Sequence, residues 1–207
     1  MSGETASLWV AAPTEALCLD FANTRFWRGR DMPTETLKVV DDVLTWCAGN
    51  AAAPERQIAL LKERWAARPE EGAAVLDGAV TLREAIYRLF HGIADAGGPD
   101  PDDLDILNKA LAAAPARREI AKSGTGYGWR VAAQGPSALA LLTPVLWSAS
   151  DLLVSPRLDR VRHCANGACQ WLFLDDSESG NRRWCSMSAC GNRAKAHRHY
   201  LRKKSQG

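Results

Sequence analysis

The sequence predicts an α+β protein that is mainly helical, with a helical N-terminal domain, one β-hairpin and a small cysteine-bearing module at the C-terminus. Three observations support this prediction. Apolar residues recur at helical spacing through most of the first 155 residues. Two strand-like segments flank a Ser-Gly-Thr-Gly turn at residues 123–126. Four of the six cysteines lie within 27 residues near the C-terminus.

Four segments of the N-terminal region have the apolar periodicity of amphipathic helices. We expect helices over 34–48, from Pro54 through Trp65, over 70–96 and over 102–113. Pro54 suits the first turn of a helix, because the N–H that proline lacks has no partner there. The run Gly97-Gly98-Pro99 ends the third helix.

The N-terminal region closes with a hairpin and one more helix. Segments 118–122 and 127–132 are the expected strands. Residues 137–154 are apolar enough for a buried helix, which we expect to bend at Pro144 and to join the two domains. The predicted domains are residues 1–155 and 156–207.

Composition excludes several classes of protein. The chain is 46% hydrophobic and 24% charged, which is ordinary for a globular protein and excludes a fully disordered chain. Its apolar runs are shorter than the roughly 18 to 20 residues that a membrane-spanning helix needs. The N-terminus lacks a basic start and an apolar core, so no export signal is evident. We therefore expect a soluble, cytoplasmic protein with no membrane partner.

The small net charge of +2 hides an uneven distribution. Residues 156–207 carry eleven Lys and Arg against four Asp and Glu, a net charge of +7, and the first 155 residues carry −5. No acidic residue follows Glu178. Such asymmetry indicates a module that meets a polyanion, although a solvated basic tail would look the same.

The four C-terminal cysteines form two equal pairs. Cys164 and Cys169 make the first pair, Cys185 and Cys190 make the second, and fifteen residues separate the pairs. Each pair can bring two sulfurs to one ion, and the spacer returns the chain to complete a tetrahedron. Disulfides or free thiols are the alternatives, and disulfides require an oxidising compartment. We predict one structural Zn²⁺ in a closed site, for which no histidine is needed.

The sequence around the cysteines predicts a treble-clef-like finger. Strands are expected over 159–163 and 170–174, followed by a loop over 175–181. Ser188 is the expected N-cap of a helix over 189–203, which would place Cys190 in its first turn.

These residues resemble a known family. Cys190-Gly191-Asn192-Arg193 spells the motif of the CGNR zinc fingers, and the similarity extends over about residues 158–204. The segment Leu17-Cys18-Leu19-Asp20-Phe21-Ala22-Asn23-Thr24 resembles the opening of the ABATE domain that usually precedes this finger. Members are described as stress-induced transcription regulators. The resemblance implies a zinc finger that binds DNA, with the four cysteines as ligands.

The last helix carries a basic stripe. At 100° per residue, Lys195, Arg198 and Arg202 fall on one side, where they suit contacts with phosphates. The opposite half carries Ala194, His197, Tyr200 and Leu201, which could pack on the hairpin. The predicted nucleic-acid-binding residues are Arg182, Arg183, Lys195, Arg198, Arg202, Lys203 and Lys204. The alternative is a basic helix that only increases solubility.

Two further groups of polar residues are candidates for a role at the zinc site or in a ligand pocket. Asn192 and Arg193 are expected to hydrogen-bond the sulfurs or the first strand and so support the site, with a base-reading Arg193 as the alternative. Asp20, Asn23 and Thr24 could line a ligand pocket, or form a buried hydrogen-bond network or helix cap.

No catalytic motif is recognisable, so we expect no enzyme. The leading function is a transcription regulator in which the basic finger binds DNA. Its N-terminal domain would sense a small-molecule effector or mediate association, including homo-oligomer formation. RNA binding is the second possibility. The third is a structural zinc module for protein association, attached to a metabolite-binding helical domain.

Overall fold

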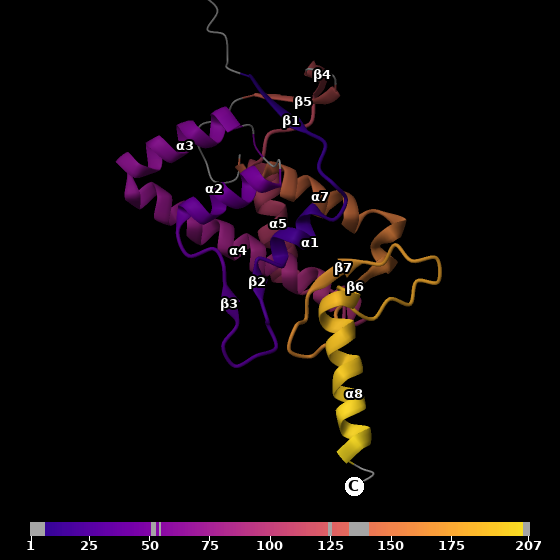
Figure 1. The fold of residues 1–207 in the computed structure, drawn as a ribbon. Helices are drawn as coiled ribbons and strands as arrows, with labels where there is room; N and C mark the ends of the chain where they lie inside the picture. The colour runs from indigo at the N-terminus through magenta and orange to yellow at the C-terminus, as the bar shows by residue number, and fades with distance from the viewer. Residues whose placement is uncertain (1–6, 51–52, 54, 124–125, 133–140, 205–207) are drawn as a thin grey trace, which may run out of the picture.

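A computed structural model of the chain describes residues 7–50, 53, 55–123, 126–132 and 141–204. The molecule consists of a helical body, a three-stranded sheet at one end, and a cysteine-bearing finger whose last helix projects from the other end (Figure 1). This is the predicted α+β, mainly helical class. Among the described helices, none combines the length and apolarity needed to cross a membrane.

The body is built from helices that surround a long central one. The body helices are α1 (Leu17–Ala22), α2 (Val40–Gly49), α3 (Glu55–Ala67), α4 (Pro69–Ala94), α5 (Pro101–Ala113) and α7 (Thr143–Leu153). Helix α4 packs against α1, α2, α3 and α5. Its residues Leu82, Ile86, Leu89 and Phe90 are almost fully buried and form the centre of the core.

The sheet at the end of the body contains the predicted hairpin. Strands β4 (Glu119–Ser123) and β5 (Gly126–Ala132) pair antiparallel, with Ile120 opposite Trp129. A third strand, β1 (Ser7–Ala11), pairs with the other edge of β5, so the order is β1-β5-β4. We did not predict β1, because its pairing depends on a strand more than 100 residues away.

The helix expected over 34–48 begins later than predicted. Residues Thr34–Glu35 form β3, which pairs with β2 (Arg25–Phe26) in a short hairpin. The Asp42 carboxylate accepts hydrogen bonds from the backbone N–H groups of Lys38 and Val39, at 2.8 and 3.0 Å, and so fixes the start of α2 at Val40. The prediction failed here because tertiary pairing outweighs helical periodicity.

The helix expected over 137–154 lies partly outside the described residues. In the described part, α7 starts at Thr143 and Pro144 occupies its first turn, where the missing N–H is tolerated. Helix α7 ends at Leu153, and a 3₁₀ turn over Pro156–Arg160 then leads into the finger.

The finger shares the core of the helical body. It contains β6 (Val161–His163), β7 (Leu172–Leu174), a π-helical turn over Met187–Gly191 and α8 (Asn192–Lys204). Val161, Leu172 and Leu174 are buried in the same hydrophobic cluster as α1 and α4. The finger hairpin therefore packs directly against the body. Its first strand is shorter than the predicted 159–163, because residues up to Arg160 form the 3₁₀ turn.

The start of the last helix also differs from the prediction. The side chain that caps this region is Ser186, whose Oγ accepts from the Ala189 N–H at 3.3 Å, and not Ser188. The π-helical turn places Cys190 before α8 instead of in its first turn.

Candidate zinc centre and basic surface

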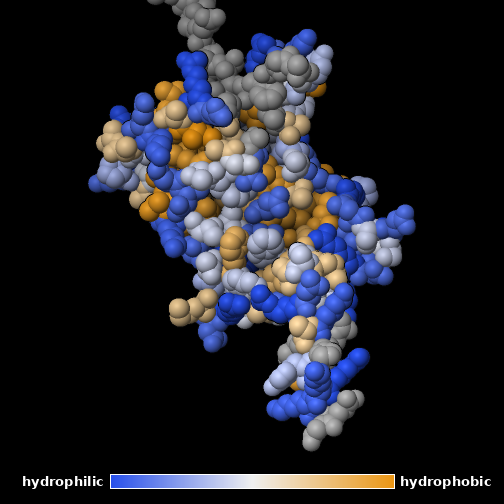
Figure 2. All heavy atoms as spheres, viewed as in Figure 1, coloured by the Kyte–Doolittle hydropathy of each residue, from blue (hydrophilic) through white to orange (hydrophobic). Residues whose placement is uncertain are grey.

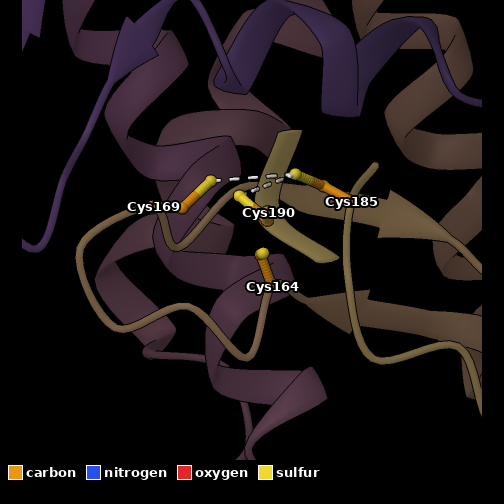
Figure 3. Close-up of side chains that lie close together, drawn as sticks. All are labelled: Cys164, Cys169, Cys185 and Cys190. Carbon is orange, nitrogen blue, oxygen red and sulfur yellow. Dashed lines mark hydrogen bonds between the residues drawn. The ribbon is translucent and has the colours of Figure 1, made fainter. Parts of the chain in front are cut away.

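The four cysteines predicted to bind zinc converge on one point (Figure 3). Their Sγ atoms all lie within 4.8 Å of one another. The Cys169–Cys185 and Cys185–Cys190 sulfur separations are 3.7 and 3.8 Å. Zn–S bonds of about 2.3 Å in a tetrahedron would place the sulfurs roughly 3.8 Å apart. This donor set and spacing fit one structural zinc.

Local backbone geometry brings the first pair together. Cys164 follows β6, and its N–H donates to the Trp171 carbonyl at 2.8 Å, which continues the hairpin ladder. The Cys169 N–H donates to the Asn166 carbonyl at 2.7 Å, closing a tight turn. Gln170 then adopts a left-handed backbone, with φ 55°, and redirects the chain into β7. Both sulfurs of the first pair consequently face the second pair.

Without a bound cation, the cysteine cluster favours ionisation of Cys169, whereas burial raises the pKa of Cys164. Hydrogen bonds from neighbouring thiols, that of Cys185 first, lower the pKa of Cys169 to about 5. The shared hydrogen bond with Cys169, together with burial, raises the pKa of Cys185. Four adjacent thiolates would repel one another, so a bound cation is needed to stabilise all four in the ionised form. Four thiolates fill a tetrahedral zinc, which would make this a structural site without an open position.

The groups around the sulfurs differ from those predicted. Asn166, on the turn between the first two cysteines, donates its side-chain N–H to Cys190 Sγ at 3.4 Å. Asn192 and Arg193 are exposed, and among the described contacts neither bonds a sulfur or the first strand, so the supporting role expected of them stays a prediction. Trp27, Trp171 and Trp184 pack on the cysteine cluster instead.

Arg193 contacts the N-terminal domain. Its guanidinium lies 4.8 Å from the ring of Trp27, and that of Arg30 lies 4.2 Å from the same ring. Trp27 and Arg30 belong to the loop between β2 and β3, which extends toward the same end of the molecule as α8 (Figure 1). Neither residue was predicted to belong to the site, although three arginines between 25 and 30 in an otherwise acidic domain were a usable signal.

Helix α8 projects away from the body (Figure 1), and hydrophilic side chains cover its far end (Figure 2). Lys195, Arg202, Lys203 and Lys204 are exposed, and Arg198 lies on the same helix. The expectation that Tyr200 and Leu201 pack on the hairpin is wrong, because their exposed fractions are 62% and 48%.

The two arginines before the second cysteine pair have different surroundings. Arg182 donates through Nε to the Trp184 carbonyl at 2.9 Å and through Nη2 to the Cys185 carbonyl, and it lies over the Phe173 ring. It therefore braces the loop that carries Cys185. Arg183 is exposed, with its guanidinium 5.3 Å from the Trp184 ring.

The residues predicted to form a ligand pocket or a buried network lie at the end of α1. Asn23 accepts from the Leu172 N–H at 3.0 Å and donates to the Leu172 carbonyl at 2.8 Å. Thr24 donates to the Phe21 carbonyl at 2.8 Å, and both side chains are buried. Asp20 is exposed. Asn23 and Thr24 therefore have the contacts of a buried hydrogen-bond network, the second of the two alternatives. The side-chain amide of Asn23 makes both of its hydrogen bonds to the finger strand β7.

Fold and site together define a zinc-finger protein in which a closed four-cysteine site and a basic helix are attached to a helical domain. Comparison with known families agrees. Residues 15–156 match ABATE, described as "Putative stress-induced transcription regulator", and residues 160–203 match the CGNR zinc finger. The chain belongs to the ABATE family and carries a CGNR zinc finger. No curated protein matches it significantly. Neither family description names an enzymatic activity.

Proposed function

We propose that the protein is a transcription regulator that binds DNA through α8 and the loops beside the zinc centre. The observation that carries this proposal is the projecting α8, which contains six Lys and Arg and no Asp or Glu. At 1.5 Å per residue, its 13 residues span roughly 20 Å. A helix of this size fits the major groove of B-DNA, and its cations can replace condensed counterions on the phosphates.

A second element widens the proposed surface. Arg30 of the β2–β3 loop and Arg193 at the start of α8 both contact the ring of Trp27, so their positive charges lie close together. Arg183 adds a further exposed cation next to Trp184. Arg182 serves the loop that holds Cys185, so the proposal leaves it out. The basic surface therefore draws on both parts of the chain.

We further propose that the N-terminal domain, residues 1–155, transmits a signal to the finger, residues 156–207. Contacts between them are specific: Asn23 holds the Leu172 backbone, and the Tyr87 hydroxyl donates to the Gln170 carbonyl at 3.0 Å. A small-molecule effector or self-association that shifts α1 or α4 would also move the segment from Cys164 to Leu172, which carries the first cysteine pair. Sensing of this kind fits a cytoplasmic, stress-responsive regulator.

A salt titration tests the DNA-binding proposal. Binding of labelled duplex DNA to the zinc-loaded full chain is measured by fluorescence anisotropy between about 50 and 200 mM salt. The variant Lys195→Ala/Lys203→Ala/Lys204→Ala should weaken binding and lower the slope of log K against log salt by about 2 to 3, close to one unit per lost phosphate contact.

The matched control removes three exposed lysines from the body, in Lys38→Ala/Lys62→Ala/Lys109→Ala. It changes the net charge equally, so its slope should stay close to that of the parent chain. Equal losses in the two variants would show that only net charge matters and would refute the α8 surface. The same titration with RNA duplexes and single strands separates the RNA alternative, and no binding to either nucleic acid would favour the protein-association alternative.

A further inference from the structure

A second group of metal-binding side chains lies at the junction of α4 and the finger. His91 and Asp95 stand one helical turn apart at the C-terminal end of α4, and His163 ends β6. One ligand atom from each of the three residues lies within 4.8 Å of the others. The group is separate from the cysteines, although His163 precedes Cys164 in the chain.

The Asp95 carboxylate lies between the two imidazoles. Its Oδ2 is 3.2 Å from His91 Nδ1, and its Oδ1 is 2.7 Å from His163 Nε2. The two rings face each other with centroids 5.0 Å apart. The buried Nδ1 of His163 has no hydrogen-bond partner among the described residues, so contact with Asp95 leaves this side chain incompletely satisfied.

These groups have the chemistry of a divalent transition-metal site. Two imidazole nitrogens and one carboxylate suit zinc and its neighbours in the first transition row. With metal–ligand bonds of about 2.0 to 2.2 Å, ligand atoms in a tetrahedron lie roughly 3.3 to 3.6 Å apart. The two measured separations are slightly shorter than this, so small side-chain rotations would admit an ion.

The surroundings favour a cation that can exchange with solvent. The C-terminal end of α4 carries the negative pole of a 26-residue helix. The side chains of His91, Asp95 and His163 are 27%, 46% and 34% exposed, so solvent reaches the group. Arg28 stacks on the ring of Tyr87, which contacts His91, and is paired with Glu84 at 2.8 Å. Its charge is thereby largely offset.

We propose that His91, Asp95 and His163 bind a second divalent metal ion of the zinc class, with at least one coordination position left to solvent. The ion joins α4 to β6, and so links the helical domain to the finger next to the first zinc ligand. It binds more weakly than the four-cysteine ion, because it has three ligands, a single anionic one, and partial exposure. Occupancy of this site then follows the available metal while the finger stays folded.

Metal counting on the full-length protein tests the proposal. Protein that holds one zinc per chain is dialysed against micromolar Zn²⁺, and bound zinc is measured by elemental analysis. We expect a second equivalent, which Asp95→Asn and His91→Gln each lose while retaining the first. Adding Co²⁺ to the one-zinc protein should give the weak visible bands of a nitrogen–oxygen site without intense thiolate charge-transfer bands, because the thiolates are already occupied.

Two controls separate this site from adventitious binding. Asp105→Asn removes an exposed carboxylate from α5, and His197→Gln/His199→Gln removes the remaining two histidines of the chain. Both should keep the second equivalent. The proposal is overturned if the parent chain binds only one zinc, if Asp95→Asn and His91→Gln both keep two, or if the His197/His199 variant loses the second ion. Because the finger zinc is counted in every sample, a variant that fails to fold is recognised by loss of both ions.

Discussion

Replacing Asn23 by alanine tests how the helical domain holds the finger. The Asn23 amide makes both of its hydrogen bonds to the backbone of Leu172, in β7. The residue before it, Trp171, instead points its carbonyl toward the other arm of the finger hairpin, where it accepts from the Cys164 N–H. Asn23 thus satisfies the backbone N–H and carbonyl of Leu172 in the way that a third strand would. Leu172 is only 1% exposed, so water cannot replace these bonds.

The expected loss follows from these two contacts. In Asn23→Ala, one buried N–H and one buried carbonyl lose their partner, and each unsatisfied group costs about 1–3 kcal/mol. The free energy of unfolding should fall by about 2–6 kcal/mol. For a chain of 207 residues, unfolding entropy near Tm converts this loss into a Tm lower by roughly 5–14 °C.

Thermal unfolding of zinc-loaded protein, followed by circular dichroism, measures the effect. Asn50→Ala is the matched control, because Asn50 is also the C-cap of its helix but is exposed, and within the described residues its side-chain amide bonds the Trp46 carbonyl of its own helix α2. Its loss should be below about 1 kcal/mol. If Asn23→Ala unfolds within 1 °C of the parent chain, the clamp on β7 contributes nothing measurable and the coupling through α1 is refuted.

Three further predictions concern other parts of the molecule. Burial raises the pKa of Cys18 and Cys47 to about 12, so after chelation of zinc at pH 8 an alkylating reagent should leave these two thiols unmodified in the native protein, and mass spectrometry showing either of them alkylated would contradict this assignment. A Cβ on Gly29 would lie 1.7 Å from the carbonyl oxygen of Gly167, in the turn between the first two finger cysteines, whereas one on Gly49 would meet nothing within 4 Å. In urea unfolding, Gly29→Ala should therefore lower the free energy of unfolding by about 1–3 kcal/mol and Gly49→Ala by almost nothing. Equal effects would argue against close packing of the β2–β3 loop on this turn. Burial opposes ionisation of Glu35, but hydrogen bonds from its buried arginine partner outweigh burial and lower the pKa of Glu35. The resulting stability is present above the unfolded pKa of about 4.5 and is lost as the pH falls through the lower folded value, so Glu35→Gln should reduce the stability lost between pH 5 and 3, and an unchanged acid profile would count against this pair.

Several features followed from the sequence because local chemistry decides them. The cysteine spacing indicated the ligand set, since two short pairs and a spacer leave few other ways to surround one ion. The third and fourth expected helices and the β4–β5 hairpin also form within a few residues of their predicted bounds. Each is specified by periodicity or by turn residues within a single segment.

Other features depend on partners that are distant in the sequence. Thr34 and Glu35 leave the expected helix because β2 and the buried Arg83 on α4 bind them. The amide that donates to the Cys190 sulfur is that of Asn166, 24 residues earlier, while Asn192, two residues after Cys190, makes no such bond among the described contacts. In both cases the sequence pattern was consistent with the prediction, but a contact from another segment was stronger.

Charge, periodicity and cysteine spacing are properties of the chain, and they were enough to predict the class of this protein, a helical acidic domain followed by a basic zinc finger. How the two parts meet depends on the fold. The fold places Asn23 on β7, Trp27 in contact with both Arg30 and Arg193, and His91 and Asp95 beside His163. These contacts arise because the finger buries its hairpin in the core of the helical domain, and packing of that kind brings together residues that no local pattern relates.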